Sequence, residues 1–333
     1  MRPPPSVDDS EALTVGVDIG GTKVLAGVVD AAGRVLDRDR RVTPGDSAAS
    51  VEAAIVDLVR SLGTDRHIGA VGVGAAGFVD EHRSRVVFAP HLAWRDEPLR
   101  DALQDRLGLP VVVDNDANTA ALAEAQVGTA AGHRFVLCVT LGTGIGGALV
   151  LDHAIFRGAN GMAGEFGHMQ VVPDGARCPC GNRGCWEQYA SGTALVREAR
   201  ELVLDGSPSA ARLRELGGAD AVSLTGPLVT QAARAGDPLS RELLGEMGRW
   251  LGIGLANLAA AFDPHCIVVG GGVSEAADLF LGSTREVFAR HLVGHGHRVP
   301  TPIVPAALGA DAGFVGAALM ARAAVPAHGD VGV

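Results

Sequence analysis

Residues 167–186 read GHMQVVPDGARCPCGNRGCW, a stretch that places one imidazole and three thiols within 18 residues. These side chains, the ligand types of a closed Cys3His zinc site, are His168, Cys178, Cys180 and Cys185. The alternatives are buried thiols or a disulfide. However, Cys178 and Cys180 are too close in sequence to pair comfortably, and any disulfide would leave one thiol over. Four protein ligands leave an ion no open position, so we predict a structural zinc site.

Two carboxylates flank the predicted zinc loop, residues 168–187. Glu165 lies three residues before the histidine, and Glu187 lies two residues after the last cysteine. Glycines within the loop permit the tight turns needed to wrap an ion, because glycine adopts conformations that other residues resist. A loop that fixes two acidic side chains in this way favours a site for a polar substrate.

Composition limits the classes of function. The 333 residues suggest roughly two domains, and a hydrophobic content of 47% excludes an intrinsically disordered chain. A net charge of −10 argues against nucleic acid as the main partner, although backbone amides and a bound cation can still hold an anionic nucleotide. The longest apolar stretch, residues 250–262, is too short to span a membrane, which takes about 20 residues. We expect no secretory signal and no membrane partner, and reduced thiols favour the cytoplasm.

Hydrophobic periodicity predicts an α/β chain after a disordered tail at residues 1–11. The chain opens as strand–turn–strand, and later strands alternate with helices. The predicted strands cover residues 13–17, 24–29, 34–42, 68–75, 111–113, 135–140, 148–151, 266–269 and 303–305. The predicted helices cover residues 47–62, 117–126, most of 193–262, 274–291 and 311–324.

The first glycine-rich loop lies between the first two predicted strands. Gly20 and Gly21 would bring backbone amides close to a phosphate, Thr22 adds a hydroxyl, and Asp18 could hold Mg²⁺ through water. Lys23 completes the motif, which is not a Walker loop because the required glycine–lysine spacing is missing. The alternative is an ordinary hairpin turn.

Two further glycine clusters point to a nucleotide. Residues 142–147 match the dinucleotide fingerprint formally, but a strand follows where that fingerprint needs a helix, so we predict a second hairpin-type phosphate loop. Its residues are Gly142, Thr143, Gly144, Gly146 and Gly147. The third cluster, Gly270, Gly271 and Gly272, ends a predicted strand and is either a close approach to an adenosine or a simple strand–helix turn.

The sequence Asp114-Asn115-Asp116 ends a predicted apolar strand. An aspartate at a strand tip can act as a general base toward a hydroxyl, and a neighbouring asparagine can hydrogen-bond to other hydroxyls. The alternative is capping of the helix that follows, since both residue types are favoured caps. One residue could cap while another carries chemistry.

These motifs, in this order, resemble the ROK family of sugar kinases over residues 13–325, and within it bacterial glucokinases of the actinobacterial type. The most specific part joins Gly161-Met-Ala-Gly-Glu165-Phe-Gly-His168 to Cys178-Pro-Cys-Gly-Asn-Arg-Gly-Cys185-Trp-Glu187. The resemblance implies an actin-like, hexokinase-like ATPase fold with two α/β domains around a cleft. The expected small domain is residues 12–120 plus 310–325, and the large domain is residues 121–309 with the zinc loop.

The resemblance also implies roles for residues. Asp116 would take the proton from the sugar 6-hydroxyl, with Asn115 touching the sugar beside it. Glu165, His168 and Glu187 would hydrogen-bond the other hydroxyls, with Gly77 lining the sugar pocket. The first two glycine loops would bind the phosphates, and Gly270–Gly272 would contact the adenosine. The implied cofactors are ATP, Mg²⁺ and structural Zn²⁺, in a homodimer or homotetramer.

The implied reaction is ATP-dependent phosphorylation of glucose to glucose 6-phosphate, a step of glycolysis. Other family members act on N-acetylmannosamine, N-acetylglucosamine, fructose or allose, and ADP or polyphosphate stays open as donor. Family repressors carry a DNA-binding domain before the first glycine loop, for which 13 residues before Thr14 leave no room. A nicotinamide oxidoreductase built on residues 142–147 is a further alternative. His91 replaces an asparagine common in the family, and specificity would differ if this position touches the sugar.

Overall fold

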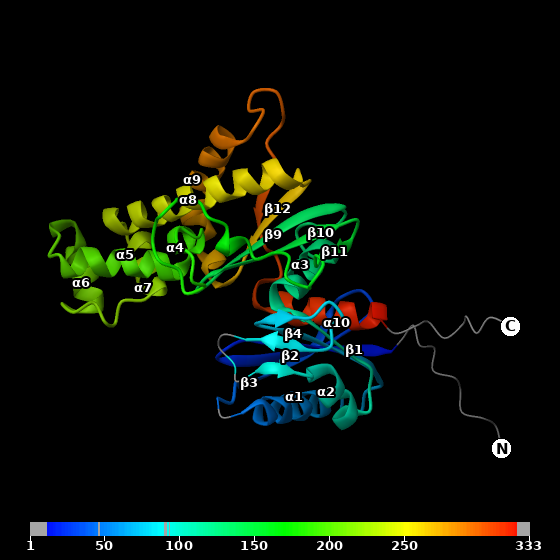
Figure 1. The fold of residues 1–333 in the computed structure, drawn as a ribbon. Helices are drawn as coiled ribbons and strands as arrows, with labels where there is room; N and C mark the ends of the chain where they lie inside the picture. Colours follow the sequence, from blue (N-terminus) through cyan, green and yellow to red (C-terminus); the bar gives the residue numbers. More distant parts are fainter. Residues whose placement is uncertain (1–11, 46, 90–91, 93, 325–333) are drawn as a thin grey trace, which may run out of the picture. The chain divides into compact units, whose positions relative to one another are not determined.

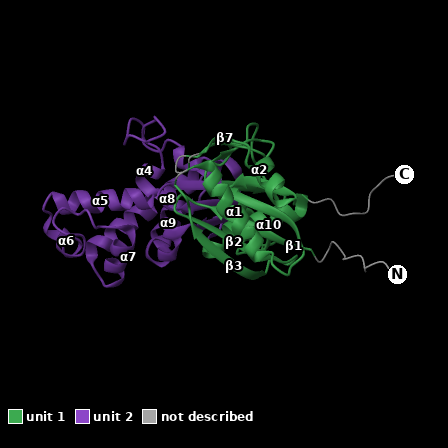
Figure 2. Cartoon of the chain, turned by 90° about the horizontal axis from the view of Figure 1, so that it is seen from below, with its two compact units in different colours: residues 1–134, 148–164, 307–333 green, residues 135–147, 165–306 purple. Residues whose placement is uncertain are grey.

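The computed structural model describes residues 12–45, 47–89, 92 and 94–324 (Figure 1). The expected tail at residues 1–11 and the departure at His91 lie outside these residues. Within them, no helix is both long enough and apolar enough to cross a lipid bilayer. The chain divides into two compact units (Figure 2). Unit 1 comprises residues 1–134, 148–164 and 307–333, and unit 2 comprises residues 135–147 and 165–306.

A five-stranded sheet in the order β3-β2-β1-β4-β8 forms the centre of unit 1. β1 pairs antiparallel with β2, which pairs antiparallel with β3, while β1, β4 and β8 run parallel. The strands are β1 (Leu13–Ile19), β2 (Lys23–Val29), β3 (Val35–Val42), β4 (Ile68–Ala75) and β8 (Val111–Asn115). A small antiparallel sheet holds β5 (Phe78–Val79), β6 (Val86–Phe88) and β7 (Arg95–Glu97).

Helices cover both faces of this sheet. α1 (Ala48–Leu62) and α2 (Leu99–Leu107) share one hydrophobic cluster with strand residues such as Val17 and Val73. α3 (Asp116–Gln126) and α10 (Ala312–Ala324) form a second cluster with β2 through Phe314. The strands lie very close to α10, since a Cβ added at Gly16 or Gly72 would lie 1.7 or 1.8 Å from a carbonyl oxygen of α10.

A second five-stranded sheet has the order β11-β10-β9-β12-β13, with β9, β12 and β13 parallel. Its strands are β9 (Phe135–Leu141), β10 (Ile145–Leu151), β11 (Ala154–Ile155), β12 (Cys266–Gly270) and β13 (Ile303–Pro305). The helices of unit 2 are α4 (Glu187–Ala190), α5 (Gly192–Leu204), α6 (Ala211–Gly217), α7 (Gly226–Arg234), α8 (Pro238–Phe262) and α9 (Ala277–His291). Short 3-10 turns cover Phe166–His168 (η2), Pro208–Ala210 (η3), Gly272–Ala276 (η4) and Gly309–Asp311 (η5).

The predicted mixed α/β architecture is confirmed, and strands 68–75 and 303–305 are observed with the predicted bounds. The strand predicted after the second glycine loop is β10, so this loop joins two strands and opens no helix. The helix predicted from Ser274 was placed too early, because α9 begins at Ala277. Both the backbone N–H and the hydroxyl of Ser274 donate to Gly271 O, at 3.0 and 2.7 Å, which tightens the first turn to a 3-10 helix.

The expected domain division stays a prediction, and the two units differ from it in three segments. Residues 121–134, 148–164 and 307–309, expected in the large domain, cluster with unit 1. In the second of these segments, Arg157 forms an ion pair with the buried Asp114 at the end of β8.

Replacing Gly72 by alanine should destabilise unit 1 strongly. The added methyl group would lie 1.8 Å from Ala317 O, and backbone cannot rotate away as a side chain can. We expect a loss of about 3 kcal/mol in the free energy of unfolding, at the upper end for overpacking, measured by urea denaturation. The exposed Gly45 has nothing within 4 Å of its added Cβ and serves as control. Equal stability of both variants would contradict this packing.

Candidate functional site

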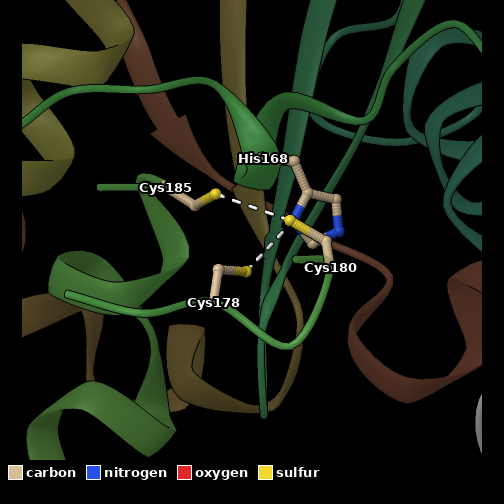
Figure 3. A group of neighbouring side chains, drawn as sticks. All are labelled: His168, Cys178, Cys180 and Cys185. Carbon is tan, nitrogen blue, oxygen red and sulfur yellow. Dashed lines mark hydrogen bonds between the residues drawn. The ribbon is translucent and has the colours of Figure 1, made fainter. Parts of the chain in front are cut away.

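The four predicted zinc ligands meet in unit 2. The ligand atoms of His168, Cys178, Cys180 and Cys185 all lie within 4.8 Å of one another, turned toward a common space (Figure 3). Cys178 Sγ is 3.6 Å from His168 Nδ1, and Cys180 Sγ is 3.7 Å from Cys185 Sγ. A tetrahedral ion with Zn–S bonds of about 2.3 Å would set its sulfur ligands about 3.8 Å apart. The donor set and its spacing therefore fit a structural zinc ion held through Nδ1.

Two aromatic side chains anchor the zinc loop to the rest of unit 2. Trp186, next to the last cysteine, is fully buried and donates from Nε1 to Trp250 O at 2.8 Å. Its backbone N–H donates to Met169 O, which ties the two ends of the loop together. Tyr189 Oη accepts from the N–H of Ala176 at 2.8 Å, in the middle of the loop. The end of the loop is thus fixed to α8 through Trp186, and its middle is fixed to α4 through Tyr189.

The two flanking carboxylates lie near different nitrogen atoms of the His168 ring. Glu165 Oε2 is 3.9 Å from Nε2, and Glu187 Oε1 is 3.7 Å from Nδ1 and 3.1 Å from Cys178 Sγ. Burial raises the pKa of Glu165, His168 lowers it, and the negative Glu187 raises it further, with a net upward shift. Because Nδ1 faces the cysteines, Nε2 is left for Glu165 or for a ligand. The zinc cluster and both predicted sugar-binding carboxylates therefore form one group.

This group adjoins the second glycine loop. A Cβ added at Gly144 would lie 2.5 Å from Glu187 Oε2, so the loop lies directly beside this carboxylate. Gly271, with a φ of 83°, packs against the end of β9, where a Cβ added to it would lie 2.4 Å from Leu141 O. The two predicted nucleotide loops of unit 2 are therefore neighbours. Gly146 and Gly147 lie within β10, and Gly147 is buried, so their phosphate role stays a prediction.

A cavity of about 570 Å³ opens beside Gly142 and Thr143. Gly192 N donates to Gly142 O at 2.9 Å, so the amino end of α5 lies against the predicted phosphate loop. The walls of this cavity, which were not predicted from the sequence, come mainly from α5, α7 and the residues just before α7. Two sequences typical of helix starts, Ser191-Gly-Thr and Thr225-Gly-Pro, could have revealed these walls, but the region was predicted only as mostly helical. The walls include Gly192, Thr193, Val196, Arg197, Arg200, Leu224, Thr225, Gly226 and Val273.

The first glycine loop is the β1–β2 turn of unit 1. Gly20 N donates to Lys23 O at 3.0 Å, and Gly21, Thr22 and Lys23 are exposed. Asp18 is half-buried at the end of β1, where burial and the negative Asp116 raise its pKa to about 7 against the opposing effect of Lys23. A bound cation would reverse that shift, because positive charge favours the ionised carboxylate. The hairpin predicted from the sequence is confirmed, and its phosphate role stays a prediction.

The predicted base and its neighbours lie at the junction of β8 and α3 in unit 1. Asn115 caps α3, since its Oδ1 accepts from Ala117 N at 2.8 Å and Asn118 N at 3.2 Å. Its Nδ2 donates to Gly77 O at 3.1 Å, which brings two predicted sugar-binding residues together. Asp116 is the first residue of α3, so the helix starts one residue earlier than predicted. Capping thus falls on the asparagine and leaves Asp116 as the candidate base.

A family model described as the ROK family matches residues 14–324. The chain belongs to the ROK family. It is 47% identical over 310 residues to a glucokinase of Streptomyces coelicolor, covering 93% of this chain and 98% of that protein. It is also similar to the crystal structure of a ROK family glucokinase from Streptomyces griseus in complex with glucose and AMPPNP. That similarity has a TM-score of 0.85 and 48% identity, and covers 94% of this chain and 100% of that one.

A ROK hexokinase from Thermus thermophilus is similar to the chain at 36% identity, with a TM-score of 0.79 and coverage of 93% of this chain and 98% of that one. The hexokinase-like ROK fold predicted from the motifs is thereby confirmed. The Cys3His cluster lies within the residues that the ROK family model matches.

Replacing Cys180 by serine should release zinc and loosen the loop of this ROK protein. Serine binds zinc poorly, so the ion would lose one of four ligands, and metal binding is coupled to folding of such loops. We expect about one zinc per chain in the wild type and well under half in the variant, measured by atomic emission. The melting temperature should fall in parallel.

The control is Cys266→Ala, because Cys266 is buried in β12 outside the cluster. Full zinc content in this control and in Cys180→Ser alike would contradict the assignment of the ligands.

Proposed function

We propose that this protein is a cytoplasmic glucokinase that transfers the terminal phosphoryl group of ATP to the 6-hydroxyl of glucose. The observation that carries the proposal is the position of Glu187, which adjoins the zinc cluster through Cys178 and the phosphate loop at Gly144. One residue thereby links a group suited to sugar hydroxyls with a loop suited to phosphates. The similarity to a glucokinase solved with glucose and AMPPNP, extending over nearly the whole chain, supports the same conclusion.

Glucose is held by hydrogen bonds from Glu165, His168 and Glu187. The carboxylates accept from sugar hydroxyls, and His168 Nε2, which faces away from the cysteines, serves another hydroxyl. His168 Nδ1 and the three cysteines would hold zinc, which would fix the imidazole ring; the ion would take no part in the transfer, because the protein fills its coordination positions. Holding the sugar in one orientation lowers the entropic part of the barrier.

Asp116 removes the proton from the sugar 6-hydroxyl as the oxygen attacks the phosphorus. The O–P bond forms as the bond to the leaving phosphate oxygen breaks, and the proton goes to the Asp116 carboxylate. Asn115 fixes the backbone beside it by capping α3, and its amide also reaches Gly77 O. Phosphoryl transfer depends mainly on positioning and charge stabilisation. The base therefore lowers the barrier in addition to the contacts that bind the phosphates.

In unit 2, Gly142–Gly144 binds the phosphates of ATP and the cavity beside α5 takes the adenosine. The phosphate-binding loop of unit 1 is Asp18–Lys23. Gly270–Gly272 borders the nucleotide on the side of Val273, which lines that cavity. Asp18 would supply the carboxylate of unit 1 for Mg²⁺, which would neutralise charge on the phosphates. The amino ends of α5 and α7 contribute backbone N–H groups and a favourable dipole.

A sugar panel tests the specificity. Initial rates with ATP and Mg²⁺ should be higher for glucose than for N-acetylmannosamine, N-acetylglucosamine, fructose or allose, because the full set of hydroxyl-binding side chains is present. The same panel with ADP or polyphosphate tests the donor. A kcat/KM more than about tenfold higher for an N-acetylhexosamine than for glucose, a difference of about 1.4 kcal/mol, would contradict the glucose assignment while leaving the fold intact.

Replacing Asp116 by asparagine tests the base. Asparagine keeps the shape but cannot take a proton, and general-base catalysis contributes about 10²–10⁴-fold. We expect kcat to fall by that order with a small change in the KM for glucose, measured in a coupled assay. Asp105→Asn, an exposed position on α2, serves as control. More than half of the wild-type kcat in Asp116→Asn would show that Asp116 is no base.

A further inference from the structure

A second carboxylate at the tip of β8 is buried and uses all of its hydrogen-bonding capacity. Asp114 is 2% exposed. Its Oδ1 accepts from the backbone N–H of Asn115 at 2.8 Å and from Asn118 Nδ2 at 2.7 Å. Its Oδ2 accepts from Arg157 Nε at 2.8 Å and lies 2.6 Å from Nη2. No lone pair is left for a substrate, so Asp114 cannot itself do chemistry on one.

Asp114 accepts hydrogen bonds from residues before and after Asp116 in the sequence. Asn115 precedes Asp116, and Asn118 lies in the same first turn of α3. The Asn118 Oδ1 is buried without a hydrogen-bond partner among the described residues, so its amide is oriented through Asp114 alone. Asp116 Oδ1 accepts from Ala117 N at 2.9 Å, which ties the carboxylate to that same turn. Any displacement of the turn therefore displaces the candidate base.

Arg157 supplies the charge that makes a buried carboxylate tolerable at this place. It follows β11, and its side chain is 24% exposed against 3% for that of Asp114. Its Nη1 donates to Ile155 O at 3.2 Å, which fixes the guanidinium to the backbone. A buried carboxylate without a cation would be strongly disfavoured, so the position of Asp114 depends on Arg157.

We propose that Asp114 and Arg157 are positioning residues that aim the Asp116 carboxylate at the sugar hydroxyl. The inference rests on the proposed function, since it assigns Asp116 as the base. The pair acts through the first turn of α3 and touches no substrate. Misplacing a reacting group by about 1 Å can lower a rate about 100-fold, so the effect of losing the pair should fall on kcat.

The matched comparison is between the two buried carboxylates at the ends of α3. Glu124, also 2% exposed, lies at the opposite end of the helix and accepts backbone N–H groups of Thr129, Ala307 and Leu308. Asp114→Asn and Glu124→Gln each remove one negative charge and replace one of the two acceptor oxygens of a buried carboxylate with an amide nitrogen. Both should lower the melting temperature, but only Asp114→Asn should lower kcat, by about tenfold or more. Equal kcat in the two variants would overturn the proposal.

A double-mutant cycle separates positioning from a general loss of structure. If Asp114 acts through the base, its replacement should change kcat less than about twofold in the Asp116→Asn background, because the aimed group is already gone. The proposal would be overturned if the factors by which the two single replacements lower kcat multiplied in the double variant. If Asp114→Asn does not fold, Arg157→Lys decides. This variant keeps the charge but loses the two-nitrogen contact, so kcat should fall and the cycle with Asp116→Asn should again be non-additive.

The outcomes distinguish the two proposals. If Asp116→Asn alone retains the wild-type kcat, the base assignment is wrong and the positioning role falls with it. If Asp116→Asn loses activity while Asp114→Asn and Arg157→Lys behave like Glu124→Gln, the proposed function stands and only the positioning role is wrong.

Discussion

The geometry of unit 2 depends on the Cys3His cluster, because the segment that carries Glu165, His168 and Glu187 has almost no regular structure. Between Glu165 and Glu187 the chain forms one 3-10 turn and two isolated β-bridges, Gln170↔Cys185 and Arg177↔Arg183. Long loops without secondary structure are uncommon in compact domains unless they serve a function. Trp186 and Tyr189 fix the ends and middle of the loop, and a metal ion would fix the His168 side. Two carboxylates then gain defined positions without a helix or strand beneath them.

In unit 1, the candidate base is held in position without a metal site. Its candidate base lies at the first turn of a regular helix, and buried carboxylates hold that helix at both ends, Asp114 with Arg157 and Glu124 with the backbone before α10. Glycines in β1 and β4 let α10 pack directly on the sheet, so the helix layer has little freedom to shift. One unit thus orders its polar groups with a metal site, and the other with buried hydrogen bonds and close packing.

Much of this could be predicted from the sequence. The cysteine spacing predicted the cluster, and short apolar runs bounded by turn residues predicted most strands, because both signals are local. The cavity walls on α5 and α7 were missed, since they come together with Gly142 only through packing of segments about 50 to 85 residues further along the chain. The Asp114–Arg157 pair spans 43 residues and leaves no periodic trace. The 3-10 start before α9 depends on hydrogen bonds from Ser274 that a helical pattern does not reveal.

If the zinc loop gives the proposed sugar-binding side chains their geometry, loss of the metal should weaken glucose binding. The most direct test measures glucose binding to the wild-type protein by isothermal titration calorimetry as purified, after removal of metal with a chelator, and after zinc is added back. The account predicts that affinity for glucose falls by about tenfold or more without metal and returns with zinc, because His168, Glu165 and Glu187 lose and regain their positions. An unchanged dissociation constant in the metal-free protein would contradict it.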